Sequence, residues 1–176
     1  MGFFSSSNDP LLNEKAKLIV NDLFVLFDNF DNDLKNNIPG LQVIERESVK
    51  FRFITAGSYY LTTILAGDKS ISNRKYTKLI DGIYIAGNSK NPIYEEQMKY
   101  CKEILKTSIG NIREWKGTEQ DLFNQIKLTI GLCAPVPIPV ELQSERFGKY
   151  SSLIGEYIIY KITMYWKIKR DTYLPF

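Results

Sequence analysis

Oxygen-bearing side chains gather at the end of the first helix that the sequence predicts. Asp28, Asp31 and Asn32 lie three and four residues apart, so a helix would place them on one face. Such side chains are of the kind that bind Mg²⁺ or Ca²⁺. The stretch lacks the glycine and the distal glutamate of an EF-hand loop, and a solvated helix face explains it better. We therefore expect no bound metal and no cofactor.

Four basic side chains lie around the start of a later predicted helix, where they could bind an anion. They are Lys69, Arg74, Lys75 and Lys78. Cations at this place oppose the positive end of the helix dipole, whereas phosphate groups are attracted to it. With Arg46, Lys50 and Arg52, they make the segment 46–78 a candidate for binding phosphate or nucleic acid. The net charge of only +3 does not favour nucleic acid as the partner.

Aromatic side chains are abundant, with 11 tyrosines and 10 phenylalanines. The tyrosines cannot all be fully buried unless their hydroxyl groups find partners, and Tyr and Trp are favoured at protein interfaces. The candidates for an interface are Tyr157, Tyr160, Tyr165 and Trp166. For any one of them, a place in the core is the better explanation. We expect part of the set to form a contact surface.

Histidine is absent from the 176 residues. Its absence excludes Ser-His-Asp and Cys-His catalysis and the HExxH zinc helix. Cys101 and Cys133 form no CxxC pair, and we expect two small buried side chains in a protein of the reducing cytoplasm. The sequence presents no other set of acid, base and nucleophile. It therefore predicts a protein that binds and is not an enzyme.

Helices must position all of these residues. Asp9 and Pro10 are a capping residue and a first-position proline, and apolar residues then recur at three- and four-residue steps as far as Leu34. Further helices are predicted over about 73–86, 92–115, 118–130 and 144–169. These segments are therefore predicted to be helical, and one further segment is ambiguous.

That segment fits two structures. Val49, Phe51 and Phe53 alternate with lysine and arginine, as in a strand. Phe51 also begins a stripe of residues at helical spacing that ends before a glycine. We favour a helix over about 45–66, and a short hairpin at about 41–55 is the alternative.

Two features predict how the helices pack. The last helix, 144–169, is apolar on most sides, so we expect it to be the central one. Gly82 with Ala86, and Ser151 with Gly155, place small residues one turn apart. These pairs favour close helix crossings over a ligand-facing groove.

The sequence as a whole predicts an all-α, single-domain bundle of about six helices with a long apolar C-terminal helix. The domain would cover 9–176 after a flexible leader at 1–8, and an α+β fold would follow if the hairpin formed. No segment has the roughly 20 apolar residues of a membrane span. We expect a cytoplasmic, non-enzymatic interaction module whose partner is another protein or a second copy of the chain. A bundle that binds an apolar small molecule or lipid is the alternative, as is the phosphate or nucleic-acid binder described above.

Overall fold

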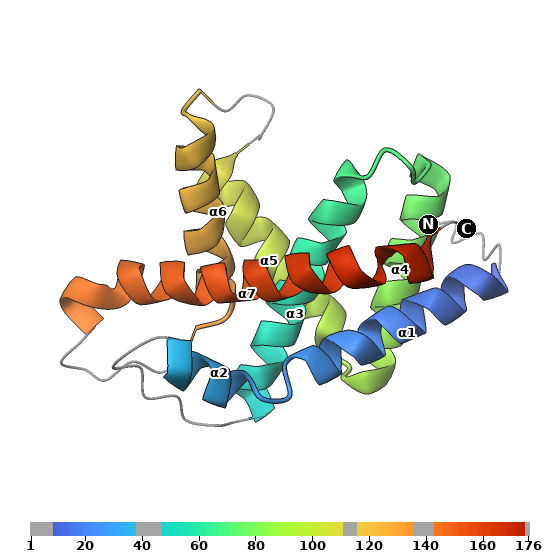
Figure 1. Cartoon of the computed structure of the whole chain (residues 1–176), viewed down its shortest axis with the longest axis horizontal. Helices are drawn as coiled ribbons and strands as arrows, with labels where there is room; N and C mark the ends of the chain where they lie inside the picture. Colours follow the sequence, from blue (N-terminus) through green and yellow to red (C-terminus); the bar gives the residue numbers. More distant parts are fainter. Residues whose placement is uncertain (1–8, 38–46, 111–115, 136–142, 175–176) are drawn as a thin grey trace.

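The computed structural model describes residues 9–37, 47–110, 116–135 and 143–174. Within these ranges all regular structure is helical, which confirms the predicted all-α bundle (Figure 1). The helices are α1 Pro10–Leu26, α2 Phe30–Asn37, α3 Glu47–Gly67, α4 Asn73–Lys90, α5 Tyr94–Ile109, α6 Glu119–Cys133 and α7 Gln143–Tyr173. The leader predicted at 1–8 lies outside the described residues.

The first predicted helix is in fact two helices, which is why seven are described where about six were expected. A turn at residues 27–29 separates α1 from α2. Asp28 and Asn29 are turn-favouring residues, and the turn changes the direction of the chain. Phe30 and Leu34 on α2 are therefore still buried against the core.

Helix α3 settles the ambiguous segment. Residues 47–55 are helical, so the hairpin alternative is wrong there, and 41–46 lie outside the described residues. The alternation of Phe51 and Phe53 with charged residues resembles a strand. It arises here because both phenylalanines are buried on a helix that is covered on most sides. α3 contacts α1, α4, α5, α6 and α7, and this makes it the central helix.

Helix α7 is 31 residues long and runs across the front of the molecule in Figure 1. Its expected apolar character on most sides is not confirmed. Ile154, Ile158 and Ile162 face the core, while Glu156 and Lys167 are among the exposed residues on its outer side. The helix is amphipathic and covers the core from one side.

Acidic residues of the N-terminal helices pair with basic residues of α7. Lys161 Nζ lies 2.6 Å from Asp33, and Lys169 Nζ lies 3.6 Å from Asp22. These pairs fix the register of α7 against α1 and α2. They also neutralise two acidic side chains of the N-terminal segment within the chain.

The small-residue pairs form close helix crossings, as predicted. A Cβ atom at Gly82 would lie 2.8 Å from Cβ of Ala16 on α1. A Cβ at Gly155 would lie 1.7 Å from the carbonyl oxygen of Lys127 on α6. The backbones of α6 and α7 therefore touch at a point that only glycine allows.

An ion pair fastens the end of α7 to the turn between α3 and α4. Arg170 Nε donates to Asp68 Oδ2 at 2.9 Å, and Arg170 Nη2 donates to Ser70 Oγ at 3.1 Å. Hydrogen bonds from Arg170 and Ser70 hold the pKa of Asp68 well below its ordinary value of 3.8. A carboxylate with a lowered pKa stabilises the fold in full above its unfolded pKa, near 4, and the effect is lost as the pH falls below it.

Asp68→Asn is therefore expected to lower the free energy of unfolding by about 1 kcal/mol near neutral pH. The difference from the wild type should shrink as the pH is lowered to about 2.5, because Asp68 is then protonated in the unfolded chain while its lowered pKa keeps it ionised in the folded protein. Urea unfolding of both proteins at the two pH values measures this. A difference that stays constant with pH would show that the Asp68 charge does not contribute.

Candidate functional site

Three hollows follow α1 along the surface and share lining residues. The first, of about 350 Å³, is lined by Pro10, Asn13, Glu14 and Lys17. The second, of about 190 Å³, lies between α1 and α4 and is lined by Lys17, Val20, Asn21, Ala86, Ser89 and Lys90. The third, of about 470 Å³, is also lined by Lys90. Because Lys17 and Lys90 each line two of them, we treat the hollows as one feature, the α1 groove.

The helical repeat of α1 explains the course of the groove. Asn13, Lys17, Val20 and Phe24 follow one another at steps of three and four residues and so occupy one side of the helix. With a rise of 1.5 Å per residue, the groove extends about 21 Å from Pro10 to Phe24. That length equals about four helical turns.

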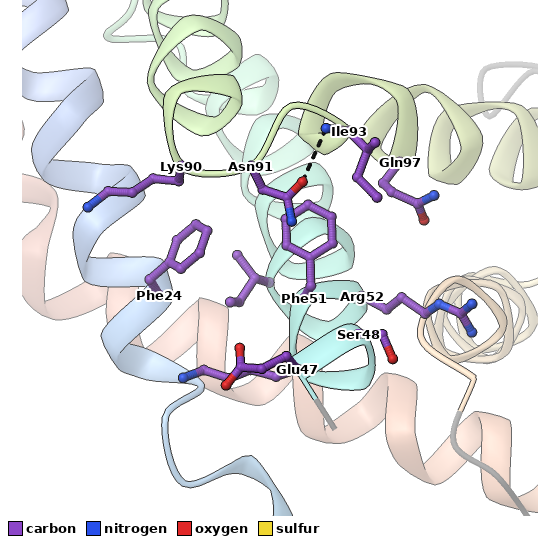
Figure 2. A pocket seen from close by; sticks show the side chains of 11 residues that line it. Phe24, Glu47, Ser48, Phe51, Arg52, Lys90, Asn91, Ile93 and Gln97 are labelled. Atoms are coloured by element: carbon purple, nitrogen blue, oxygen red, sulfur yellow. Dashed lines mark hydrogen bonds between the residues drawn. The ribbon is translucent and has the colours of Figure 1, made fainter. Parts of the chain in front are cut away.

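The largest hollow, which we call the cleft, lies where α1, the first turns of α3 and the junction of α4 with α5 meet (Figure 2). Its apolar side chains are Phe24, Phe51, Ile54 and Ile93. Phe51 and Ile54 are buried, whereas Ile93 is exposed. The cleft therefore has an apolar floor that is partly open to solvent.

Charged and polar groups stand around this floor. Figure 2 shows Lys90 on the same side of Phe51 as Phe24, and Arg52 on the other side with Gln97. Lys50 forms an ion pair with Asp28. Within the described part of the chain, neither Arg52 nor Lys90 has an ion-pair partner. The cleft thus offers two cations that are available to a ligand.

The remaining polar groups of the cleft are held differently. The Asn91 side chain accepts a hydrogen bond from the Ile93 backbone N–H at 3.2 Å, which fixes the turn between α4 and α5. Glu47, in the first turn of α3, is the cleft's single carboxylate. Since Lys50 is paired with Asp28, Arg52 and Lys90 against Glu47 leave the lining positively charged.

The predicted anion site lies elsewhere. Lys69, Arg74 and Lys75 are exposed, and Lys78 is half-buried, around the turn between α3 and α4. Arg74 lies at the opposite end of α4 from Lys90, about 24 Å away along the helix. The structure thus brings Lys50 and Arg52 of the basic segment into the cleft but leaves these four residues apart from it.

The candidate metal ligands are engaged with lysines. Asp28 pairs with Lys50, and Asp31 pairs with Lys35 at 3.4 Å. Asn32 is exposed. The residues that the structure describes contain no group of three His, Cys, Asp or Glu side chains that could hold a metal ion.

The aromatic residues predicted as an interface are mostly internal. Tyr157, Tyr165 and Trp166 are buried within the chain, where they pack against its own core. Tyr157 donates a hydrogen bond to Asp33 at 2.9 Å, and burial together with that carboxylate raises its pKa. Tyr160 is 62% exposed and remains available to a partner.

Buried tyrosine hydroxyls find partners on distant helices. Tyr173 donates to Asp22 at 2.7 Å, and Tyr94 donates to Ser58 at 2.5 Å. Burial raises the pKa of Tyr94 in spite of that hydrogen bond. These contacts explain how a small core holds so many tyrosines.

Sequence reasoning missed Phe24, Lys90 and Ile93 as site residues. Each occupies an ordinary position on its own helix or turn, and only the packing of three segments brings them together. Lys50 and Arg52 carried a signal, since they belong to the basic segment. The basic segment did not show, however, that these two residues lie apart from the cations at the start of α4.

Within the described residues, no helix is long and apolar enough to cross a membrane. The chain matches no protein-family model, no curated protein and no solved structure. Its own geometry is therefore the basis for assigning a function.

Proposed function

We propose that this protein is a non-enzymatic interaction module that binds an amphipathic, acidic helical segment of a partner protein in the α1 groove. The observation that carries the proposal is the cleft, where an apolar floor lies beside Arg52 and Lys90. An apolar side chain of the partner would pack on Phe51 and Ile93. Carboxylates next to it would meet the two cations.

The shape of the groove supports a protein segment as the occupant. A length of about 21 Å matches four turns of helix, and binding of an amphipathic helix in a groove is a common mode of recognition. Small-molecule sites are generally more enclosed than this open groove. The cleft's lining also offers one carboxylate and no acid–base pair suited to catalysis.

A synthetic peptide tests the proposal. It would have about 16 residues, with leucines at helical spacing, one tryptophan as an anchor and glutamates between them. The wild-type protein is expected to bind it with a Kd in the micromolar range, as measured by fluorescence anisotropy. Amide chemical shifts should change around Lys17, Phe51 and Lys90.

Charge reversal identifies the site. Arg52→Glu and Lys90→Glu are each expected to weaken binding about tenfold, equivalent to 1.4 kcal/mol. Arg74→Glu is the matched control, because Arg74 is an exposed cation outside the groove, and it should leave binding unchanged. Equal loss in all three variants, or no shift in the groove at millimolar peptide, would contradict the proposal.

A further inference from the structure

We infer that two copies of this chain form a two-fold symmetric dimer through the outer sides of α1 and α7. The occupant of this surface is a second copy of the chain. The inference goes beyond the proposed function and does not depend on it, because the α1 groove follows a different side of α1.

Exposed apolar side chains are concentrated on these two helices. Among the residues that the structure describes, ten large hydrophobic side chains are exposed, and six of the ten lie on α1 or α7. They recur at steps of seven residues on α1 and of four residues on α7, so each set occupies one side of its helix. The six, which we call the dimer face, are Leu11, Leu18, Val25, Tyr160, Met164 and Ile168.

Contacts between the helices place the α1 set beside α7. The two helices run in opposite directions, with α1 below α7 in Figure 1. Lys15 Nζ donates to the carbonyl oxygen of Tyr173 at 2.7 Å, and Lys169 Nζ lies 3.6 Å from Asp22. Leu18 is three residues from Lys15 and four from Asp22, so it lies on the same side of α1 as both.

The α7 set points away from the core. Ile162 and Trp166 are buried, and Met164 and Ile168 each follow one of them by two residues, which is more than half a helical turn. Ile168 also adjoins Lys169, which reaches across to α1. The two sets therefore border each other on the outside of the molecule.

The dimer face is large enough for a stable pair. Its six side chains are 38–70% exposed, which leaves on the order of 500 Å² of apolar surface open to water. A standard interface buries about 800 Å² on each partner, and about 65% of that area is apolar in homodimers. The dimer face thus supplies the apolar area that one partner contributes.

The exposed charges of α7 suit a second copy. Lys167 and Asp171 are exposed, four residues apart and opposite in sign. When two α7 helices cross antiparallel at a two-fold axis beside Lys169, Lys167 of each copy lies opposite Asp171 of the other. Asp171 also lies 3.5 Å from Arg170 Nη1, but that guanidinium is already held by Asp68. The symmetry therefore provides two reciprocal ion pairs.

The oligomeric state of the full chain tests the inference. Sedimentation velocity from about 5 to about 500 μM should show a monomer–dimer equilibrium with a Kd of about 10 μM. Ile168→Asp is expected to weaken association at least tenfold, since it places a charge at the centre of the contact. Ile85→Asp, at a 68% exposed position on α4, is the matched control and should dimerise like the wild type. A wild-type monomer at about 500 μM, or equal loss in both variants, would overturn the inference.

Exchanging charges tests the two-fold arrangement. Lys167→Asp and Asp171→Lys should each weaken self-association about tenfold, because each places like charges opposite one another. An equimolar mixture of the two variants should dimerise about as tightly as the wild type, since every pair in the mixed dimer is again of opposite sign. An effect within one chain could not be reversed by mixing. A mixture that associates no more tightly than either variant alone would overturn the arrangement, whatever peptide binding in the α1 groove shows.

Discussion

Replacing Gly155 by alanine is expected to destabilise the protein by about 3 kcal/mol, at the upper end of the usual cost of overpacking. The added Cβ would lie 1.7 Å from the carbonyl oxygen of Lys127 and 2.7 Å from its carbonyl carbon. Both are backbone atoms of α6, so no side chain can turn aside to make room. Helices α6 and α7 would therefore have to move apart at this crossing. Urea unfolding followed by circular dichroism measures the loss.

Gly148→Ala is the matched control on the same helix. No atom outside its own stretch of helix lies within 4 Å of the Cβ that it would add. At an exposed helical position, alanine is more stable than glycine by about 0.5–1 kcal/mol. This variant should therefore be as stable as the wild type or more so. If Gly155→Ala behaved in the same way as Gly148→Ala, the close crossing of α6 and α7 would be refuted.

This crossing shows how far sequence reasoning reaches. Ser151 and Gly155 stand one turn apart on one helix, and that local spacing predicted a close approach. The opposing residue could not be predicted, because nothing local to Gly131 pairs it with α7. In the structure, a Cβ at Gly131 would lie 1.7 Å from the carbonyl oxygen of Ser151. Local patterns thus predicted the contact but not its partner.

Helix starts were predictable wherever a side chain caps the helix. Asp9 caps α1, Ser72 caps α4, and Thr118 with Asp121 forms a capping box on α6. These signals lie within four residues of sequence, so they need no tertiary information. The helix start predicted at about residue 92 was less exact, since α5 begins at Tyr94. There the Asn91 side chain stabilises the turn between two helices and does not cap the second one.

The aromatic residues of α7 show what a single sequence cannot reveal. The buried Tyr157 donates a hydrogen bond from its hydroxyl group to Asp33, and Tyr173 donates in the same way to Asp22. Both carboxylates are more than 100 residues away in the sequence. Since burial of a tyrosine depends on such a partner, composition alone could not identify which tyrosines would be buried. The cleft likewise depends on contacts between residues distant in the sequence, because its floor comes from separate helices, and so it could not be predicted.

Phe53→Ala is expected to cost about 3–5 kcal/mol, the usual range for truncating a buried phenylalanine. Phe53 is fully buried in the second turn of α3. Its ring lies 5.0 Å from that of Phe30, 6.2 Å from that of Phe27 and 6.1 Å from that of Tyr157. Truncation would leave a cavity between the side chains of Phe27, Phe30 and Tyr157. The free energy of unfolding in urea is the measurement.

Phe123→Ala makes the same chemical change at a position that is 42% exposed, so a cost of about 0.5 kcal/mol is expected there. Phe53→Leu keeps part of the volume and allows a measurement if the alanine variant does not fold. Similar losses at positions 53 and 123 would contradict the placement of Phe53 in the core.

Two neighbouring residues of α3 are expected to affect different properties, one the stability of the protein and the other its peptide binding. Phe53 faces the core, whereas Arg52, the preceding residue, is exposed on the rim of the cleft. Phe53→Leu should therefore lower stability and leave the peptide affinity of the folded fraction unchanged, because its side chain does not line the cleft. Arg52→Glu should weaken peptide binding and leave the stability unchanged. If the two variants lost stability and affinity in the same proportion, the weakened peptide binding would reflect unfolding, and Arg52 would not be a contact residue.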